Sequence, residues 1–149
     1  MTWGDWTQSV LALMAWREAR NQGRDGMRAV MHVARNRAIS DKRDLAAVIV
    51  ADAQFSSINP PKDQYDPQLD EWPASNDPIF RDSMQLASEV MAGLDPDLTN
   101  GAYYYWNPKT SKADSWFARN IANTPLNPQP HQLLATLGEH DFYSKEKKI

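Results

Sequence analysis

One glutamate of this sequence occupies a position where a helix would normally place an apolar side chain. Leu11, Met14 and Glu18 are spaced i, i+3 and i+7, so the carboxyl group of Glu18 continues the face that should pack inward. A carboxylate among apolar and aromatic side chains loses hydration, which raises its pKa and keeps a proton available near neutral pH. Glu18 is therefore a candidate general acid.

Neighbouring arginines leave a second interpretation open. Arg17 and Arg20 lie near enough in sequence to pair with Glu18, and a glutamate is rarely buried without a partner. A nearby cation would lower the pKa of Glu18 unless its guanidinium points into solvent. On spacing alone, Glu18 is either a catalytic acid or a solvated residue at the end of a helix.

Three helices are expected in the first part of the chain. The first begins near Asp5, which forms a capping-box pattern with Gln8, and ends at about Arg20. The second runs from about Asp25 to Ile39, and a short third helix runs from Asp44 to about Asp52. The inward stripe of the second helix consists of Met27, Val30, Met31 and Ala34.

Three polar residues of the second helix have other expected roles. His32 is expected at the surface or on a flank of the helix rather than as a metal ligand. Asn36 and Arg37 are close to the end of the helix, where they could cap it or brace the loop below.

A proline-rich stretch from Ile58 to Asn76 cannot hold a long regular element and is expected to be a surface loop. Such loops often form the walls of a cleft, so Tyr65 and Trp72 could contact a ligand, although anchoring of the loop is the commoner role. After it, Asp77, an N-cap followed by proline, and Gly93, a stop signal, delimit a fourth helix.

An aromatic run over residues 101–107 is strongly β-prone. With a period of two, one face of this strand carries Tyr104 and Trp106, and the other carries Tyr103, Tyr105 and Asn107. One face should pack on the core and the other could line a cleft. A short helix at 114–120 and a final short strand at 138–143 follow, before a charged tail at 144–149 that is expected to fray.

These elements predict an α+β fold, a mainly helical single domain over residues 1–149 with a core of about 5–143 and a small β-sheet or hairpin. Phe55 and Phe142 are expected in the core, and Ser56 at a cap or turn.

Charge and composition exclude several classes of function. With 16 basic and 19 acidic residues, a net charge of −3 and no long basic run, the chain does not resemble a nucleic-acid-binding protein. The absence of cysteine excludes disulfide scaffolds and thiol nucleophiles. The histidines at 32, 131 and 140 lack metal-ligand spacing, so neither a metal nor another cofactor is expected.

The N-terminal residues lack a basic region followed by an apolar run, and no apolar stretch reaches the length of a membrane span. The sequence therefore predicts synthesis in the cytoplasm without a classical signal peptide and no stable insertion into a membrane.

Five short motifs, taken in their order along the chain, resemble the cell wall hydrolase family of spore cortex-lytic enzymes over about residues 10 to 143. They are Glu18-Ala-Arg, Asn36-Arg, Gln54-Phe-Ser, Gly101-Ala-Tyr-Tyr-Tyr-Trp-Asn-Pro and Gly138-Glu-His-Asp-Phe. The resemblance implies a lysozyme-like α+β domain that cuts the glycan strands of peptidoglycan, typically as a lytic transglycosylase, with Glu18 as the catalytic acid. A single-domain chain of 149 residues without a classical signal peptide is also expected of a phage endolysin that reaches the wall through a membrane lesion.

Three positions depart from the pattern of similar members. Trp106 stands where a tyrosine is usual, which removes a phenolic hydroxyl but leaves a ring that can stack on a sugar. Arg17 replaces a small residue before the catalytic glutamate, and Glu139 stands where asparagine is common. Tyr104 and Asn107 keep their places.

Cleavage of a glycosidic bond needs one protonated carboxyl group, and hydrolysis needs a second carboxylate as nucleophile or base. The acids near the motifs of the resemblance are Asp52, Glu139 and Asp141, and each is expected to have a structural role. Lytic cleavage avoids the second carboxylate, because the 6-hydroxyl of the muramic acid attacks internally and one glutamate serves first as acid and then as base. The lytic reaction is therefore preferred over that of a hydrolytic muramidase.

Further residues could contact the sugar. Tyr104 could donate a hydrogen bond or stabilise the developing charge, Trp106 could stack on a ring, and Asn107 and Gln54 could hold acetamido or hydroxyl groups. The remaining candidates for substrate binding are Tyr105 and His140.

Two other classes stay open. A catalytically inactive peptidoglycan-binding module would keep the aromatic residues and tolerate Arg17. An interaction protein, such as a virion component, would use its tryptophans against a protein partner and would show no affinity for glycan strands.

For the preferred enzyme, the expected partner is the peptidoglycan glycan strand, and the protein is expected to be a monomer.

Overall fold

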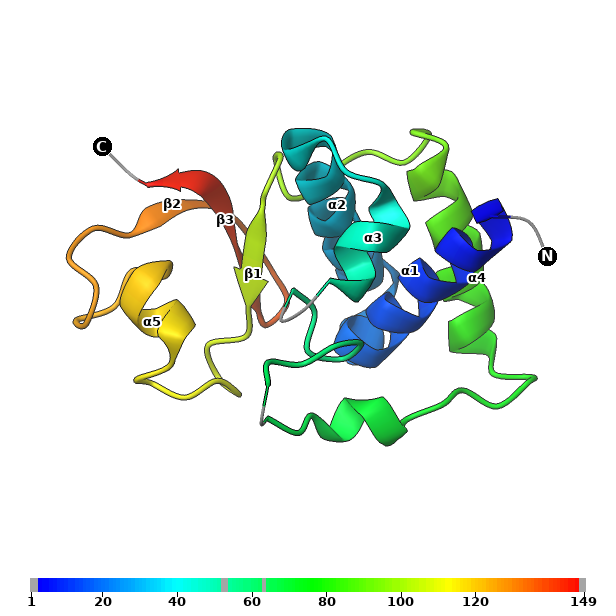
Figure 1. Ribbon diagram of the computed structural model, residues 1–149, viewed down its shortest axis with the longest axis horizontal. Coiled ribbons are helices and arrows are strands. Elements are labelled where there is room, and N and C mark those ends of the chain that lie inside the picture. The colour runs from blue at the N-terminus through cyan, green and yellow to red at the C-terminus, as the bar shows by residue number, and fades with distance from the viewer. Residues whose placement is uncertain (1–2, 52–53, 63, 148–149) are drawn as a thin grey trace.

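The computed structural model describes residues 3–51, 54–62 and 64–147. It is a mixed, mainly helical fold with a small three-stranded antiparallel sheet in this described part of the chain. Helices α1 to α4 gather on one side of the molecule, and the sheet and α5 lie on the other (Figure 1). The helices are α1 (Trp3–Ala19), α2 (Gly23–Asp41), α3 (Leu45–Val50), α4 (Pro78–Met91) and α5 (Trp116–Asn120), with short 3-10 turns at Arg20–Gln22 and Pro67–Asp70.

The long helices α1, α2 and α4 enclose the main core, and the predicted inward stripes are confirmed. Leu11 and Met14 of α1 and the four stripe residues of α2 are all buried. The predicted capping box is wrong, because α1 already begins at Trp3 and places Asp5 inside its first turn. Gln8 instead donates its amide to the carbonyl of Met84 at 2.9 Å, which fixes α1 against α4.

His32 is not on the surface, contrary to expectation, but buried within α2. Its Nε2 lies 2.9 Å from Oδ2 of Asp95, which is equally buried in the turn after α4. A carboxylate 63 residues away in sequence therefore allows a polar side chain to enter the core.

Helix α4 begins and ends where the sequence predicts. The side chain of Asp77 accepts from the backbone N–H groups of Ile79 at 2.8 Å and Phe80 at 3.2 Å, as an N-cap should. Gly93 follows the helix with φ of 73°, a left-handed conformation that glycine adopts without strain.

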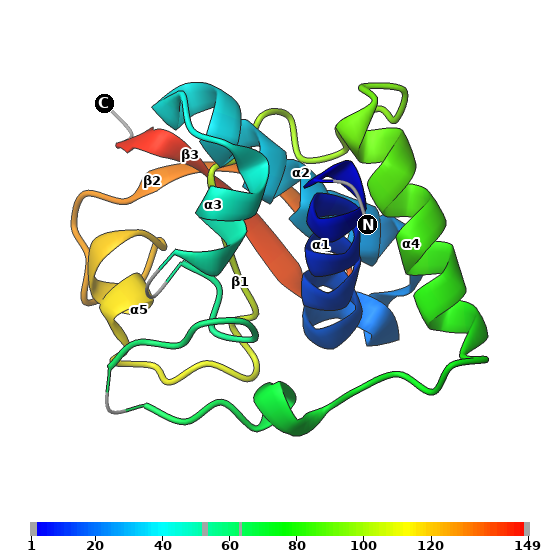
Figure 2. The same cartoon turned by 45° about the vertical axis from the view of Figure 1, so that its right-hand side comes forward.

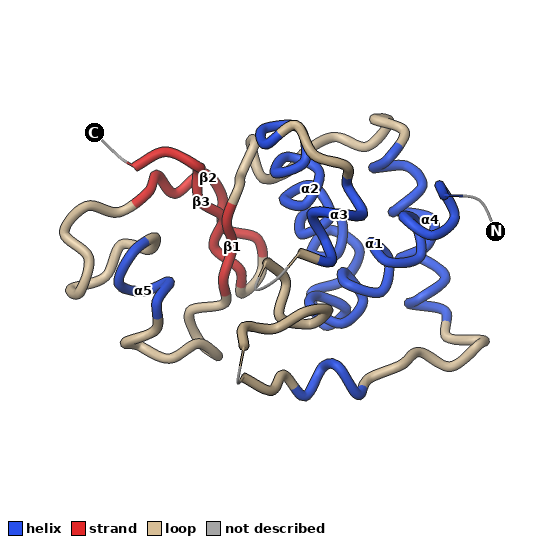
Figure 3. Tube along the Cα trace, viewed as in Figure 1, coloured by secondary structure: helices blue, strands red, loops and turns tan. Residues whose placement is uncertain are grey.

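The sheet contains β1 (Tyr104–Trp106), β2 (His131–Leu137) and β3 (His140–Lys147), with β3 in the middle and both neighbours antiparallel to it (Figure 3). Two expectations are wrong here. Residues 131–137 form a strand that the sequence did not indicate, and 144–147 continue β3 instead of fraying. Backbone hydrogen bonds to β2 explain the second difference, since His131 pairs with Lys147.

Two turns dock the sheet onto the helices. Gly138, between β2 and β3, has φ of 59°, and a Cβ atom there would lie 2.1 Å from Oε1 of Gln22. The same Oε1 accepts from the backbone N–H of Glu139 at 3.0 Å. The positive φ of Gly138 favours glycine, and the hydrogen bond to Gln22 joins the start of β3 to the 3-10 turn after α1.

The turn before β1 is organised by one carboxylate. Asp97 accepts hydrogen bonds from the backbone N–H and hydroxyl of Thr99, the N–H of Gly101 and the amide of Asn36. Asn36 also donates to the carbonyl of Ala102. Arg37 donates to the carbonyl oxygens of Tyr103 and Gln54, so both residues brace loops, as the sequence suggested.

No helix within the described residues is both long enough and apolar enough to span a membrane.

Candidate active site

A groove of about 1190 Å³ runs between the helical part and the sheet. In two views α1 lies on the helical side of the molecule, α5 lies beyond the sheet, and the loop between α3 and α4 passes below (Figures 1 and 2). Residues from all these regions line the groove, among them Arg17, Glu18, Arg20, Arg37, Gln54, Tyr65, Glu71, Tyr105, Trp106, Asn107, Trp116, Phe117 and His140.

Glu18 lies in the groove near the end of α1 and is half-buried. Its Oε2 accepts a hydrogen bond of 2.5 Å from the hydroxyl of Tyr105, and its Oε1 accepts one of 3.4 Å from the backbone N–H of Ser57. Among the described residues, no lysine or arginine forms an ion pair with Glu18. The carboxyl group is thus held by neutral donors alone.

Burial raises the pKa of Glu18 above the ordinary value of a glutamate. Hydrogen bonds from Tyr105 and Ser57 lower the pKa in part, and the negative charge of Asp66 raises it further. Burial together with the charge of Glu18 also raises the pKa of Tyr105 well above that of a free phenol, so Tyr105 remains a hydrogen-bond donor. The arrangement favours a protonated carboxyl group that faces a groove.

Arg17, which could have lowered the pKa of Glu18, points its guanidinium elsewhere. It donates to the backbone carbonyls of Ser57 at 2.7 Å, Glu71 at 3.0 Å and Leu69 at 3.2 Å. The guanidinium also lies 4.6 Å from the ring centre of Trp72. Arg17 is buried and anchors the proline-rich loop, so the ion-pair interpretation of Glu18 does not describe this structure.

The proline-rich loop forms one wall of the groove. Arg20 pairs with Glu71 at 2.9 Å, and Gln68 donates to the carbonyl of Arg17 at 2.5 Å. Trp72 is exposed and packs on Arg17, in accord with an anchoring role, whereas Tyr65 lines the groove.

The aromatic strand divides its side chains between two environments, as period two predicts. Tyr105 packs against the main core and reaches Glu18, with its ring 5.6 Å from that of His140. Tyr104 and Trp106 belong to a second cluster around Ile121 and Tyr143.

Tyr104 is the one candidate site residue that the structure keeps away from the groove. Its ring packs edge-on against Phe117 and His131, and Tyr104 is absent from the groove lining. The hydroxyl beside Glu18 belongs to Tyr105 instead, because the register places Tyr105 opposite Phe142 of β3. Sequence alone could not distinguish the two faces.

The other candidate residues gather in the groove. Trp106 stacks on Phe117, with 5.1 Å between the ring centres and 20° between the ring planes, and both line the groove. Asn107 donates to Glu139 at 3.3 Å, and Gln54 is exposed on the groove wall. His140 is buried, and burial lowers its pKa, so its ring is neutral near pH 7.

Acids other than Glu18 are engaged elsewhere. Glu71, the second acid that lines the groove, pairs with Arg20. Glu139 accepts from Asn107 and lies 3.8 Å from Lys109, and Asp141 accepts from Thr136 at 2.8 Å. Asp52 lies outside the described residues. No group of three potential ligands for a metal ion occurs in the described part of the chain.

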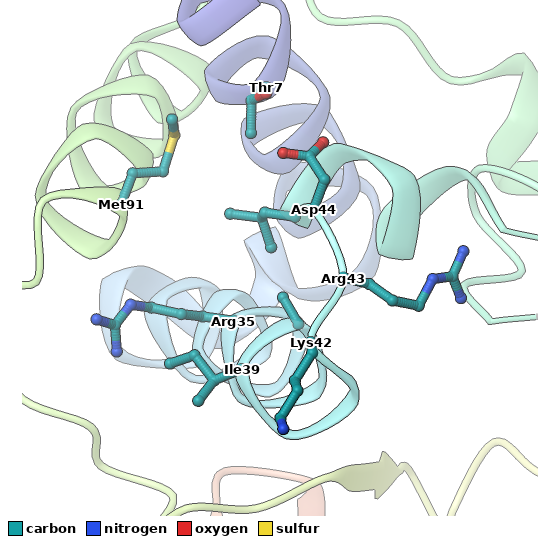
Figure 4. A pocket seen from close by; sticks show the side chains of 9 residues that line it. Thr7, Arg35, Ile39, Lys42, Arg43, Asp44 and Met91 are labelled. Atoms are coloured by element: carbon teal, nitrogen blue, oxygen red, sulfur yellow. The ribbon is translucent and has the colours of Figure 1, made fainter.

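A smaller cavity of about 460 Å³ lies at the end of α2, next to α1 and α4. Figure 4 shows that the cations around it diverge: Arg35, Lys42 and Arg43 point in different directions, while Asp44 turns toward Thr7. This cavity lacks a half-buried acid held by neutral donors, which distinguishes it from the groove.

Sequence reasoning missed two groups that shape the site. Ser57, whose backbone N–H contacts Glu18, lies one residue after the Gln54-Phe-Ser word and carried no signal of its own. Trp116 was expected only as part of a short helix, yet it is exposed and lines the groove. Its exposure could not be read from sequence.

Two solved structures have similar folds over almost the whole chain. The catalytic domain of the germination-specific lytic transglycosylase SleB from Bacillus anthracis is 21% identical, with a TM-score of 0.63 and 97% of each chain covered. The catalytic domain of the Bacillus cereus SleB protein is 20% identical, with a TM-score of 0.63, covering 94% of this chain and 91% of that one. None of the curated proteins compared with the sequence matches it.

Residues 21–143 match the family model described as Cell Wall Hydrolase. Glu18 itself precedes this span by a few residues, whereas Arg37, Gln54, Tyr105, Asn107 and His140 lie within it. The match covers most of the chain, and the chain therefore belongs to the cell wall hydrolase family.

Proposed function

We propose that this protein degrades peptidoglycan by cleaving the glycosidic bond between N-acetylmuramic acid and N-acetylglucosamine as a lytic transglycosylase. The observation that carries the proposal is the state of Glu18, an acid in a large groove whose pKa is raised and whose contacts are neutral donors. Membership of the cell wall hydrolase family supplies the class of substrate.

In the first step Glu18 donates its proton to the glycosidic oxygen as the bond between this oxygen and the anomeric carbon breaks. The electron pair of the bond leaves with the oxygen, and positive charge develops at the anomeric carbon. The carboxylate that remains on Glu18 is stabilised by the hydroxyl of Tyr105 and the N–H of Ser57, both already in place.

In the second step the 6-hydroxyl of the same muramic acid attacks the anomeric carbon, and Glu18 takes up the proton of this hydroxyl. The product is a 1,6-anhydro end, and the enzyme returns to its starting protonation state without consuming water. One carboxyl group suffices for this cycle, which agrees with the engagement of Glu71, Glu139 and Asp141 in other contacts.

The remaining groove residues bind the strand in this proposal. Trp106, backed by Phe117, offers a ring for a sugar face, and Asn107 and Gln54 offer amides to acetamido and hydroxyl groups. His140, neutral and next to Tyr105, contributes a hydrogen bond on the same wall. The protein acts on the cell wall as a single catalytic domain over residues 1–149.

Mass spectrometry of purified peptidoglycan digested with the protein tests the proposal. We expect fragments with anhydromuramic ends, and we expect Glu18→Gln to release none. Reducing ends would show hydrolysis by a muramidase. Strands that are bound but remain intact would show a non-catalytic binding module, and intact strands without binding would contradict any role at the wall.

A further inference from the structure

Two aromatic side chains that line the groove, one from the loop after α3 and one from α5, are exposed without an evident structural reason. Tyr65, in the loop between α3 and α4, is 67% exposed, and Trp116, the first residue of α5, is 64% exposed. Both line the groove. Burial of rings this large would stabilise the fold, and their exposure forgoes most of that free energy. This exposure points to a role in binding.

In the part of the chain that the structure describes, neither face of these two rings is covered by another ring, whereas the other groove aromatics each pack against at least one ring. Trp106 stacks on Phe117, and Tyr105 packs against Phe55 and Phe142. Within the described residues, neither Tyr65 nor Trp116 stacks on another ring or on a cation. Their flat surfaces are therefore available to a ligand.

Hydrogen bonds nevertheless fix the segments that carry these rings. The hydroxyl of Tyr65 donates to Asp70, which leaves the ring face as its free part. The carbonyl of Trp116 accepts from Asn120 at 2.8 Å, and Ser115 caps the helix through the N–H of Ala118 at 3.2 Å. Binding to residues on such fixed segments costs less ordering entropy than binding to residues on a flexible loop.

The two rings come from elements that are far apart in the sequence and both contribute to the lining of the groove. Helix α5, which begins with Trp116, lies beyond the sheet from α1 (Figures 1 and 2), whereas Tyr65 directly precedes Asp66, whose charge acts on Glu18. The groove, at about 1190 Å³, exceeds the range of about 300–1,000 Å³ that small-molecule sites occupy. Its size therefore suits a polymer that continues past the reacting bond.

We propose that Tyr65 and Trp116 form an aromatic clamp that holds sugar rings of the glycan strand beyond the two rings that share the bond that Glu18 cleaves. The clamp rests on the proposed function and deepens it, because it predicts a preference for long strands. Pyranose rings present an apolar C–H face that packs on an aromatic ring. Binding energy from such distant sugars lowers the barrier only for substrates long enough to reach them.

The test compares kcat/KM for long glycan strands with kcat/KM for fragments of a few sugars. We define the ratio as kcat/KM for long strands divided by kcat/KM for fragments. Trp116→Ala and Tyr65→Ala should each lower this ratio by about 3- to 10-fold, the effect of losing one aromatic contact. Leu133→Ala is the matched control, since Leu133 is 51% exposed on β2 and does not line the groove. Its ratio should equal that of the wild type.

An unchanged ratio in both aromatic variants, or an equal ratio change in Leu133→Ala, would overturn the clamp while leaving the proposed function intact. Binding of long strands to Glu18→Gln, with and without Trp116→Ala, gives a second readout that does not need turnover. We expect a 3- to 10-fold weaker binding in the double variant, by the same argument. If the wild type cleaves nothing but this difference remains, the clamp stands and the catalytic proposal fails.

Discussion

Two carboxylates of this molecule, Glu18 and Asp97, have the same chemistry and opposite environments. Asp97 accepts four hydrogen bonds, from Thr99, Gly101 and Asn36. Although burial alone would raise the pKa of Asp97, hydrogen bonds from Thr99 and Asn36 lower it below its ordinary value. Glu18 accepts only two, and burial raises its pKa. The number of donors therefore separates a carboxyl group whose pKa is lowered from one whose pKa is raised.

The largest expected effect comes from removing the proton of Glu18. Glu18→Gln should lower kcat for peptidoglycan cleavage by about 10²- to 10⁴-fold, the usual contribution of a general acid and base. Release of anhydromuramic fragments measures this rate. Glu71→Gln is the matched control, because Glu71 lines the same groove but pairs with Arg20. An equal loss in both variants would contradict the distinction between the two acids.

At Asp97 we expect a loss of stability rather than a loss of activity. Asp97→Asn removes acceptors from the turn before β1 and should lower the free energy of unfolding by about 1–3 kcal/mol, since buried donors lose their partner. Denaturant unfolding measures this change. Asp141→Asn should cost less, because Asp141 accepts a single side-chain hydrogen bond, from Thr136. If Asp141→Asn were the more damaging change, the turn would not depend on Asp97 as described.

A smaller effect is expected when the donor to Glu18 is removed. The hydrogen bond from Tyr105 lowers the pKa of Glu18, so Tyr105→Phe should raise that pKa further and leave the carboxylate less stabilised after proton transfer. We expect kcat to fall by about 3- to 10-fold, the value of one hydrogen bond, and the alkaline limb of the pH–rate profile to move to higher pH.

Tyr104→Phe serves as the control for that change, because the ring of Tyr104 packs on the far face of β1. Its pH–rate profile should match that of the wild type. A shift in the Tyr104 variant and none in the Tyr105 variant would mean that the strand register is different from the one described.

The smallest effect is a pair of opposite pH dependences of stability. The pKa of Glu18 is raised on folding, so its contribution is complete below the ordinary glutamate pKa and is lost as pH rises through the folded value. The pKa of Asp97 is lowered, so its contribution is present above the ordinary aspartate pKa and is lost as pH falls through the folded value.

Unfolding curves of Glu18→Gln and Asp97→Asn across pH measure these dependences. Relative to the wild type, Glu18→Gln should gain stability as pH rises, and the deficit of Asp97→Asn should shrink as pH falls. Slopes of the same sign would contradict the assigned pKa directions.

Local signals in the sequence were sufficient for the helices. Asp77-Pro78 and Gly93 delimit α4, and the inward stripes of α1 and α2 were correct, because caps and helical periodicity act within a few residues. For Asn36 and Arg37 the sequence predicts either a helix cap or a loop brace, and the structure shows the brace.

Long-range pairing accounts for what the sequence did not reveal. The burial of His32 depends on Asp95, far along the chain, and β2 forms only because β3 pairs with it. Likewise, the choice of Tyr105 over Tyr104 beside Glu18 follows from the register with β3, and the direction of the Arg17 guanidinium follows from loop carbonyls. The single-domain expectation stays a prediction.

The central claim is that burial, without an ion pair to any lysine or arginine that the structure describes, raises the pKa of Glu18 above the ordinary value of a glutamate. A nuclear magnetic resonance titration of the side-chain carboxyl carbons, with Glu18→Gln to assign the signal, tests this claim directly. We predict that Glu18 titrates above the ordinary glutamate pKa while Asp97 titrates below the ordinary aspartate pKa. A Glu18 pKa at or below the ordinary value would contradict the account.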